Sequence, residues 1–314
     1  MRFISSLVSI VALLASTCSV GAVVGPGVVT GDTSVHDPSM CKVGSTYYLF
    51  STAPGIEIRT STDRTKWTLA GRVFPNGASW TDTYTGTSNG NLWAPDCYHD
   101  GSKFWLYYAA SSFGSQKSAI FLATSTSGSP GSWTNNGLVI SSAAGAAYNA
   151  IDPAITVDGS THYLSWGSFW GGIYFSNHVN ATSGLLTSTS SSNIAARPNN
   201  GGALEANTLF KNGNYWYLFT SWDKCCSGTS STYNIRVGRS SSISGPFVDS
   251  SGTALTSGGG TLVLQTHDGI YGPGGQDVYL DSDGPILVYH YYTSSGNWLG
   301  INRLNFTSGW PVVA

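Results

Sequence analysis

A phrase that recurs along the chain constrains the fold more than any other feature of this sequence. A small turn ending in glycine is followed each time by a run rich in Tyr, Trp and Leu. A repeat of this kind indicates one structural unit that stacks against copies of itself. Successive copies start 57, 58, 54 and 71 residues apart, the last copy being the loosest, at Gly44, Gly101, Gly159, Gly213 and Gly284. The sequence therefore predicts five units.

Each unit holds further strand-like segments between Gly, Ser, Asn and Pro turns. Examples are the ranges 56–59, 119–124, 172–175 and 233–238, which are rich in branched and aromatic residues. About four short strands in roughly 55 residues is typical of one blade of a β-propeller. Two β-sandwich domains are the alternative, but they would leave the repeat unexplained. We predict an all-β, five-bladed β-propeller that forms a single domain over residues 23–314.

Residues 1–22 have the features of a secretory signal peptide. Arg2 precedes an apolar run from Leu7 to Ala15, and small residues follow up to Ala22. An apolar run of about nine residues is too short for a membrane helix, which needs about 20. We expect a secreted, extracellular protein with no membrane anchor, and a monomer. Nucleic acid is excluded as a partner, because the net charge is −2 and no Lys/Arg cluster is present.

The cysteines that follow the signal peptide indicate disulfides. They are Cys41, Cys97, Cys225 and Cys226. Three pairings are open, and an oxidising compartment favours bridges. We favour Cys41–Cys97 together with a vicinal Cys225–Cys226 bridge. A zinc site is the alternative, although a spacing such as C-x2-C is absent. Sequons at Asn180 and Asn305 are compatible with a glycoprotein.

Acidic residues occupy matching places in several repeats. A proline lies six residues before the turn glycine in the first three repeats, and the residue before it is Asp37, Ala94 or Asp152. If the fourth repeat is one residue longer, Glu205 has the matching place there. The innermost strands of a propeller begin beside the central axis, so these three carboxyl groups are expected to converge. Asp96, which we count as one residue out of register, is expected on the other face of its strand, as a structural carboxylate.

Three carboxyl groups around one cavity favour acid–base catalysis. Like charges held close together raise the pKa of at least one group. An acid of raised pKa beside an ionised carboxylate suits glycoside hydrolysis, because one group protonates the leaving oxygen and the other activates water or attacks carbon. Aspartates that merely begin strands are the structural alternative, yet three acids in register favour a catalytic centre.

Phrases around these residues resemble glycoside hydrolase family 43, and within it the endo-1,5-α-L-arabinanases. The matching phrases follow one another along most of the chain: His36-Asp-Pro-Ser39, Trp93-Ala-Pro-Asp96, Asn149-Ala-Ile-Asp-Pro153, Gly167-Ser-Phe-Trp-Gly-Gly172, Leu204-Glu-Ala206, Asp223-Lys-Cys-Cys226, Gly272-Pro-Gly-Gly275 and His290-Tyr-Tyr292. The resemblance implies a propeller that hydrolyses α-1,5-linked arabinan, a pectin side chain, with inversion of configuration. It implies Asp37 as the general base, Glu205 as the general acid, and Asp152 as the residue that tunes the pKa of Glu205 and holds the sugar.

The same resemblance implies a metal ion, usually calcium, on the propeller axis, held by His290 and by water. A histidine packed in the core is the structural alternative. The family-matched candidates for sugar contacts are Trp93, Asn149, Ser168 and Phe169. Phe113, just past a predicted strand, is a further candidate, and for Trp93 packing between blades is the alternative.

Two other functions stay open. An arabinofuranosidase or xylosidase would share the acids, because the loops around the cleft decide between an open groove and a blind pocket. A non-catalytic carbohydrate-binding propeller has no need of three axial carboxylates. Invertase-like and levansucrase-like enzymes typically carry Arg-Asp-Pro and Glu-Cys signatures, whereas Ala94 and Ala206 stand at those places here, which disfavours fructan chemistry.

Overall fold

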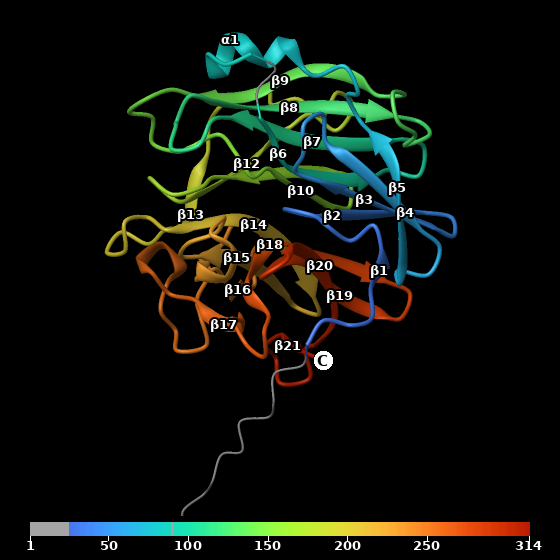
Figure 1. The fold of residues 1–314 in the computed structure, drawn as a ribbon. Helices are drawn as coiled ribbons and strands as arrows, with labels where there is room; N and C mark the ends of the chain where they lie inside the picture. Colours follow the sequence, from blue (N-terminus) through green and yellow to red (C-terminus); the bar gives the residue numbers. More distant parts are fainter. Residues whose placement is uncertain (1–24, 89–90) are drawn as a thin grey trace, which may run out of the picture.

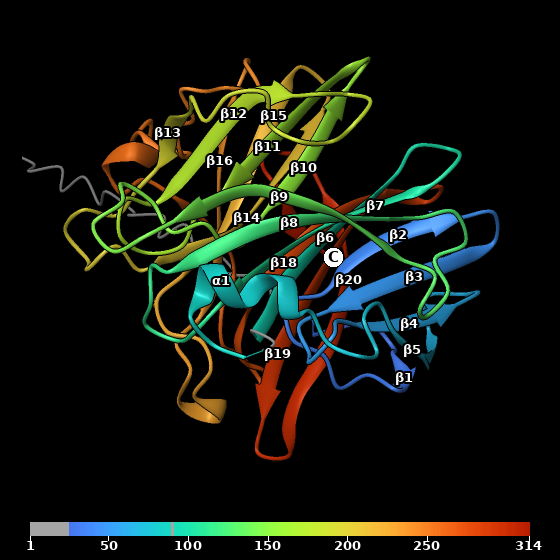
Figure 2. The same cartoon turned by 90° about the horizontal axis from the view of Figure 1, so that it is seen from above.

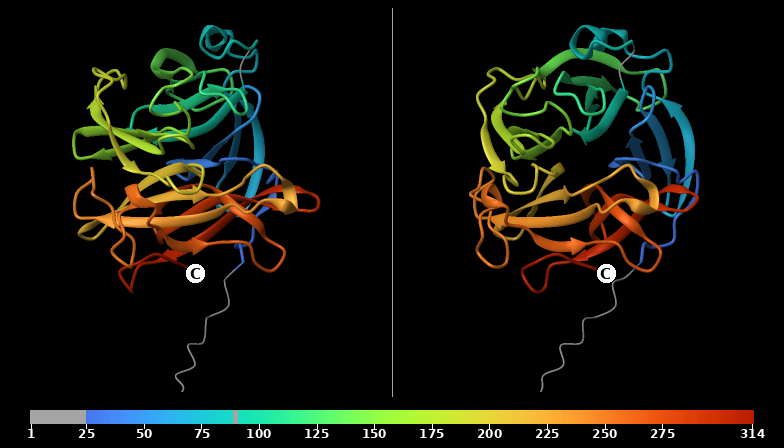
Figure 3. Two further views of the ribbon diagram at one scale, coloured as in Figure 1. Left: turned by 90° about the vertical axis from the view of Figure 1, so that its left-hand side faces the viewer. Right: turned by 60° about the vertical axis from the view of Figure 1, so that its left-hand side comes forward.

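Five β-sheets surround a common axis in the computed structural model, which describes residues 25–88 and 91–314 (Figures 1 and 3). The predicted signal peptide lies outside these described residues. No helix within them is long and apolar enough to cross a bilayer. The predicted five-bladed β-propeller is confirmed.

Each blade is a twisted antiparallel sheet of four strands, and the first blade has an extra edge strand. Blade 1 has the order β1-β5-β4-β3-β2, while the other blades follow chain order. Blade 1 consists of β1 (Thr30–Gly31), β2 (Ser39–Val43), β3 (Thr46–Ser51), β4 (Glu57–Ser61) and β5 (Lys66–Arg72). Blade 2 consists of β6 (Asn91–His99), β7 (Phe104–Ser111), β8 (Ser118–Ser125) and β9 (Thr134–Ser142). Blade 3 consists of β10 (Ala154–Asp158), β11 (Thr161–Trp166), β12 (Ile173–Val179) and β13 (Ser192–Ala195).

The last two blades repeat the pattern. Blade 4 consists of β14 (Leu204–Asn212), β15 (Tyr215–Trp222), β16 (Asn234–Ser240) and β17 (Thr261–Leu264). Blade 5 consists of β18 (Tyr271–Asp281), β19 (Gly284–Thr293), β20 (Gly296–Asn305) and β21 (Val312–Val313). The short helical turns are η1 (Ser79–Thr81), α1 (Asp82–Thr85), η2 (Gly228–Ser230) and η3 (Leu255–Ser257). Helix α1 lies against blade 2, where the Tyr84 ring contacts Phe121 (Figure 2).

The repeated phrase of the sequence forms the second strand of each blade: β3, β7, β11, β15 and β19. Each pairs antiparallel with the innermost strand that precedes it, through the glycine turn. All residues of β7 are buried. Neighbouring blades cover both faces of this strand, so its sequence is almost continuously apolar rather than alternating.

The described apolar residues form one cluster between each pair of neighbouring blades. Between blades 1 and 2, for example, Phe50 of β3 packs edge-on against Phe104 of β7. Between blades 4 and 5, Phe219 and Leu287 are both fully buried in the same cluster. Because each blade buries both faces in this way, removing one such aromatic side chain is expected to cost about 3–5 kcal/mol.

The ring closes between blades 1 and 5, where the ends of the described chain meet (Figure 1). The Gly27 N–H donates to Ile301 O at 3.0 Å, and the Leu299 N–H of blade 5 donates to Thr33 O at 2.8 Å. Asp281 of blade 5 accepts hydrogen bonds from Lys42 (2.9 Å) and Tyr47 (2.6 Å) of blade 1. Closure thus combines main-chain hydrogen bonds with a buried carboxylate that is fully paired.

Both favoured disulfides are present. Cys41 on β2 bridges Cys97 on β6 and so links blades 1 and 2, and Cys225 bridges its neighbour Cys226 in the loop after β15. Zinc ligation by these cysteines is thereby excluded.

Candidate active site

The innermost strands share a residue with left-handed backbone near their start. The φ angles are 44° at Asp37, 41° at Ala94, 52° at Asp152, 50° at Ala206 and 56° at Gly275. In β6, β14 and β18 the ladder shows a register shift at this point. Such a bulge re-aims the side chains next to it. One position in every blade therefore turns toward the axis by the same local geometry.

The prediction that Glu205 matches Asp37 and Asp152 is wrong by one residue. Ala206 has the left-handed backbone of that position, and Glu205 precedes it. Glu205 pairs with Ser221 on the second strand, just as Trp93 pairs with Ala109 in blade 2. The fourth repeat is thus not longer than the others before its glycine turn. The bulge brings Glu205 to the axis from the neighbouring position.

Asp152 and Glu205 nevertheless belong to one electrostatic group with Asp37. Burial and then the charges of Glu205 and Asp37 raise the pKa of Asp152 well above its ordinary value. Burial also raises the pKa of Glu205; hydrogen bonds from Ser168 and Tyr233 oppose this rise, and the charge of Asp37 adds to it. The three predicted acids therefore influence one another across blades 1, 3 and 4.

Glu205 is held at both carboxyl oxygens. The hydroxyl of Ser168 donates to Oε2 at 2.6 Å, and the hydroxyl of Tyr233 donates to Oε1 at 2.7 Å. The backbone N–H of Ala206, next in the chain, donates to Asp152 Oδ2 at 2.9 Å. This places Asp152 beside the backbone that carries Glu205.

Asp37 is positioned by groups from three blades. The Thr52 hydroxyl donates to Oδ2 at 2.8 Å and accepts the Ala94 N–H at 2.8 Å. The Asp37 N–H donates to His290 Nδ1 at 3.1 Å. These bonds fix both the main chain and one carboxylate oxygen, and they leave Oδ1 facing His290 at 3.6 Å.

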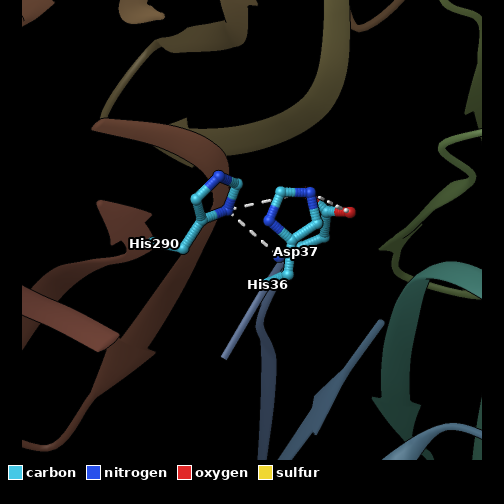
Figure 4. A group of neighbouring side chains, drawn as sticks. All are labelled: His36, Asp37 and His290. Atoms are coloured by element: carbon cyan, nitrogen blue, oxygen red, sulfur yellow. Dashed lines mark hydrogen bonds and ion pairs between the residues drawn. The ribbon is translucent and has the colours of Figure 1, made fainter. Parts of the chain in front are cut away.

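The predicted metal ligand His290 lies in a group that fits a cation. His36, Asp37 and His290 each offer a ligand atom within 4.8 Å of one another (Figure 4). Burial and the nearby His36 lower the pKa of His290 well below its ordinary value, so its ring is neutral and able to ligate. A Cβ on Gly275 would lie 2.4 Å from Asp37 Oδ1 and 2.7 Å from His290 Nδ1. Only glycine leaves this space open.

The donor set restricts which cation would be bound. Imidazole nitrogen suits zinc and related metals, whereas calcium prefers oxygen and would take most of its ligands from water. Both ring nitrogens of His290 already have neighbours, the Asp37 N–H and the Tyr292 hydroxyl, the latter at 3.1 Å from Nε2. A cation held directly by His290 would replace one of these two hydrogen bonds.

The prediction that Asp96 lies on the other face of its strand is wrong, because Asp96 lines the same axial cavity as Asp37 and Asp152. Its Oδ1 lies 3.0 Å from Ser39 Oγ, and its Oδ2 accepts the Ile155 N–H at 2.7 Å. Asp277 of blade 5 contacts the same Ser39 hydroxyl at 3.1 Å. The register again explains the error, because Asp96 lies two residues beyond the left-handed Ala94 and so on the same side. A small cavity of about 30 Å³ runs along the axis past both Asp96 and Asp37.

The predicted sugar-contacting residues have different surroundings. Asn149 is buried, with Oδ1 accepting the Ser118 hydroxyl at 2.7 Å. Trp93 is half-buried and packs on the cluster between blades 2 and 3. Phe169 is half-buried in a left-handed turn, and Phe113 is 85% exposed. The Ser168 hydroxyl donates to Glu205, so in this structure its hydrogen-bond partner is the predicted general acid.

Reasoning from the sequence missed four residues of this site: Thr52, Tyr233, His36 and Gly275. Thr52 and Tyr233 flank strands as ordinary polar or aromatic residues, and nothing in their own neighbourhoods marks them. Gly275 stands in the phrase Gly272-Pro-Gly-Gly275 that contributed to the family resemblance, but only its left-handed φ identifies it as the blade 5 counterpart of Asp37.

Comparison with known proteins agrees with this geometry. The family model described as "Glycosyl hydrolases family 43" matches residues 28–311. An extracellular endo-α-(1→5)-L-arabinanase of Bacillus subtilis is 46% identical over 285 residues, which cover 88% of this chain and 87% of that protein.

Two solved structures show the same fold over most of their length. The family 43 endo-arabinanase of Bacillus licheniformis has a TM-score of 0.85 at 42% identity, covering 91% of this chain and 99% of the other. An exo-1,5-α-L-arabinanase from a bovine ruminal metagenomic library has a TM-score of 0.84 at 33% identity, covering 90% and 97%. The chain therefore belongs to glycosyl hydrolase family 43.

Proposed function

We propose that this protein is a secreted endo-1,5-α-L-arabinanase that acts with inversion of configuration. The observation that carries the proposal is the group of Asp37, Asp152 and Glu205, whose carboxyl charges interact across three blades beside the axis. The substrate follows from the similarity to arabinanases over nearly the whole chain.

Glu205 acts as the general acid in this proposal. Burial and the charge of Asp37 favour its protonated form at the pH of catalysis. It donates its proton to the glycosidic oxygen, which is O5 of the next arabinose unit and leaves as the hydroxyl of that unit. The Ser168 and Tyr233 hydroxyls then stabilise the carboxylate that remains.

Asp37 acts as the general base. The Thr52 hydroxyl and the ring of His290 orient it, so that one carboxylate oxygen accepts a proton from the attacking water. Water adds to the anomeric carbon as the bond to the leaving oxygen breaks, which inverts the configuration. Asp152 holds the sugar and tunes the pKa of Glu205, a role supported by the electrostatic interaction between the two carboxyl groups.

A divalent cation, calcium by family resemblance, would be held by His290 with His36 and Asp37 close by. A bound cation lowers the mutual repulsion of nearby carboxylates and shifts their pKa values. Exhaustive chelation is expected to abolish activity, with recovery on adding calcium. Full activity after chelation, in protein free of metal by mass spectrometry, would rule the cation out.

By family resemblance, sugar contacts are assigned to Trp93, Asn149, Ser168 and Phe169, and a further one to Phe113 at the surface. The exposed Phe113 ring offers a flat apolar face on which a furanose can stack. Export is supported by the extracellular relative and by the N-terminal pattern. Asn180 and Asn305 are exposed, as acceptors of glycans must be. We expect a monomer.

Chromatography of the products from debranched arabinan tests the proposal, with xylan, levan and an aryl arabinofuranoside in parallel. An early ladder of short arabino-oligosaccharides is expected, and proton NMR should show β-anomers first. Arabinose alone would instead indicate an exo-acting enzyme or an arabinofuranosidase, a second candidate favoured by the similarity to an exo-arabinanase. Activity on xylan or xylosides alone would indicate a xylosidase. Binding without any release would indicate a carbohydrate-binding propeller.

A further inference from the structure

We propose that Tyr233 is a positioning residue for the general acid: its hydroxyl keeps Oε1 of Glu205 as an acceptor and leaves the transferable proton on Oε2. The inference rests on the proposed function, since it specifies how Glu205 works. Nothing in the sequence around Tyr233 indicated such a role.

The contact is short and rigidly supported. Tyr233 lies directly before β16, next to β15 in the blade that carries Glu205, and its hydroxyl lies 2.7 Å from Oε1. Tyr233 is 2% exposed. Its ring packs against the backbone of Gly274, where a Cβ would lie 2.1 Å from Cδ1. The ring therefore cannot move away from Glu205 without disturbing the start of β18.

The two hydroxyls on Glu205 differ in chemistry. A phenol is a stronger donor and a weaker acceptor than an alcohol, because its oxygen lone pair is shared with the ring. Burial and the charges of Glu205 and Asp37 raise the pKa of Tyr233 well above its ordinary value, so it keeps its proton. The Ser168 hydroxyl at Oε2 can rotate, and it can either accept from the acid or donate to the carboxylate.

The two carboxyl oxygens of Glu205 therefore have different hydrogen-bond partners, and these partners interact differently with its protonated and ionised forms. Before the reaction, Tyr233 donates to Oε1 while the proton resides on Oε2. As the proton moves to the glycosidic oxygen, the hydrogen bond from Tyr233 strengthens, because charge develops on its acceptor. An interaction that grows toward the transition state accelerates the reaction.

Tyr233→Phe tests this, and Tyr217→Phe is the matched control. Tyr217 is also a buried tyrosine of blade 4, and its hydroxyl donates to Gly309 O at 2.8 Å, away from the carboxyl group. Each variant is assayed on debranched arabinan and on an arabino-oligosaccharide carrying a dinitrophenyl aglycone. The dinitrophenolate leaves without a proton, so that substrate does not need the general acid.

For Tyr233→Phe, kcat on arabinan is expected to fall about 10- to 100-fold, the effect of one hydrogen bond to a charged group. Release of dinitrophenol should stay within about threefold of wild type, and the basic limb of the kcat/KM profile should move to higher pH. Asp37, Asp152 and His36 also act electrostatically on Glu205, and they are unchanged in both variants. Tyr217→Phe should retain both activities.

Equal losses on both substrates, or wild-type rates on arabinan, would refute the positioning role. A second measurement uses a variant that keeps the aromatic ring and hydroxyl in place. 3-Fluorotyrosine at position 233 is a stronger hydrogen-bond donor than tyrosine, so it should move the basic limb of the kcat/KM profile to lower pH. An unmoved limb would contradict the proposal as well. Wild type is assayed first, so that an inactive wild type overturns the proposed function, whereas unresponsive variants of an active enzyme overturn this inference alone.

Discussion

Replacing Asp277 by Asn should destabilise the propeller far more than replacing Asp96 by Asn, although the two carboxyl groups meet at one hydroxyl. Ser39 Oγ lies 3.0 Å from Asp96 Oδ1 and 3.1 Å from Asp277 Oδ2, and it accepts the Cys97 N–H at 3.0 Å. A hydroxyl has one proton and two lone pairs. Its proton can serve only one carboxylate, so the other carboxyl group must itself hold a proton and donate it to Ser39.

The remaining contacts identify Asp96 as the protonated partner. Asp277 also accepts the Met40 N–H at 2.9 Å; burial raises its pKa, but hydrogen bonds from Met40, Ser39, Thr208 and the backbone oppose this rise. Asp96 accepts the Ile155 N–H at Oδ2, while burial and the charge of Asp277 raise its pKa well above the ordinary value. Asparagine at position 96 can donate to Ser39 and accept from Ile155, much as the acid does.

The expected magnitudes follow from the unpaired groups. Asparagine at position 277 would turn an amide NH2 toward donors such as the Met40 N–H. Each buried donor left unpaired costs about 1–3 kcal/mol. The cavity on the axis can admit water, so we expect a total loss of about 2–4 kcal/mol. Asp96→Asn should cost less than about 1 kcal/mol by the same reasoning.

Guanidinium unfolding at pH 6, followed by tryptophan fluorescence, measures these free energies. Asp158→Asn is the control, because this half-exposed aspartate of β10 only forms a surface ion pair with Lys211 at 3.2 Å, which is worth about 0–1 kcal/mol. Because the pKa of Asp96 is raised by folding, its stabilising contribution is present at low pH and is lost as the pH rises through the folded-state value. Asp96→Asn should therefore gain on wild type as the pH increases. Equal losses in the two variants, or no pH trend, would refute the shared-proton arrangement.

Three further outcomes test the site. Gly275→Ala should abolish activity and metal binding, because its Cβ would lie 2.4 Å from Asp37 Oδ1. The control Gly213→Ala has a similar φ of 57° but open space around the Cβ, so it should leave both properties intact. Turnover and metal content by mass spectrometry are measured, and an active Gly275→Ala variant would contradict the predicted steric clash. Glu205→Gln should lose turnover on arabinan while its thermal midpoint stays near that of wild type, and full activity would remove it from the mechanism. Thr52→Val deletes the 2.8 Å hydrogen bond to Asp37 and should reduce kcat about tenfold, with little change in KM for arabino-oligosaccharides; an unchanged kcat would show that this bond does not position the base.

The propeller itself was predictable because its signal is local and repeated. The glycine turn and the following aromatic strand appear in every blade, and β7 shows why the strand is so apolar, since both of its faces are covered. The Cys41–Cys97 bridge was also favoured correctly among three pairings. These features could be predicted because they depend on residue types and spacings that are visible in the sequence itself.

The register around the axis was only partly predictable. Asp37 and Asp152 were correctly matched, since a proline and a glycine turn mark the position in both blades. Glu205 and Asp96 were each misplaced by the same kind of error. A left-handed residue with a bulge changes which side chains face the axis. At Ala94 and Ala206 this backbone conformation cannot be recognised from the residue type, because alanine rarely adopts it.

The sequence alone thus determined the number of blades, the strands and the identity of the acids that line the axis. Their partners come from elsewhere: Tyr233 meets Glu205 across 28 residues, and His290 meets Asp37 across 253. Ring closure and the bulges of the inner strands create these contacts. Such contacts arise only when the blades pack around one axis, because hydrogen-bond geometry depends on positions in space and not on separation along the chain.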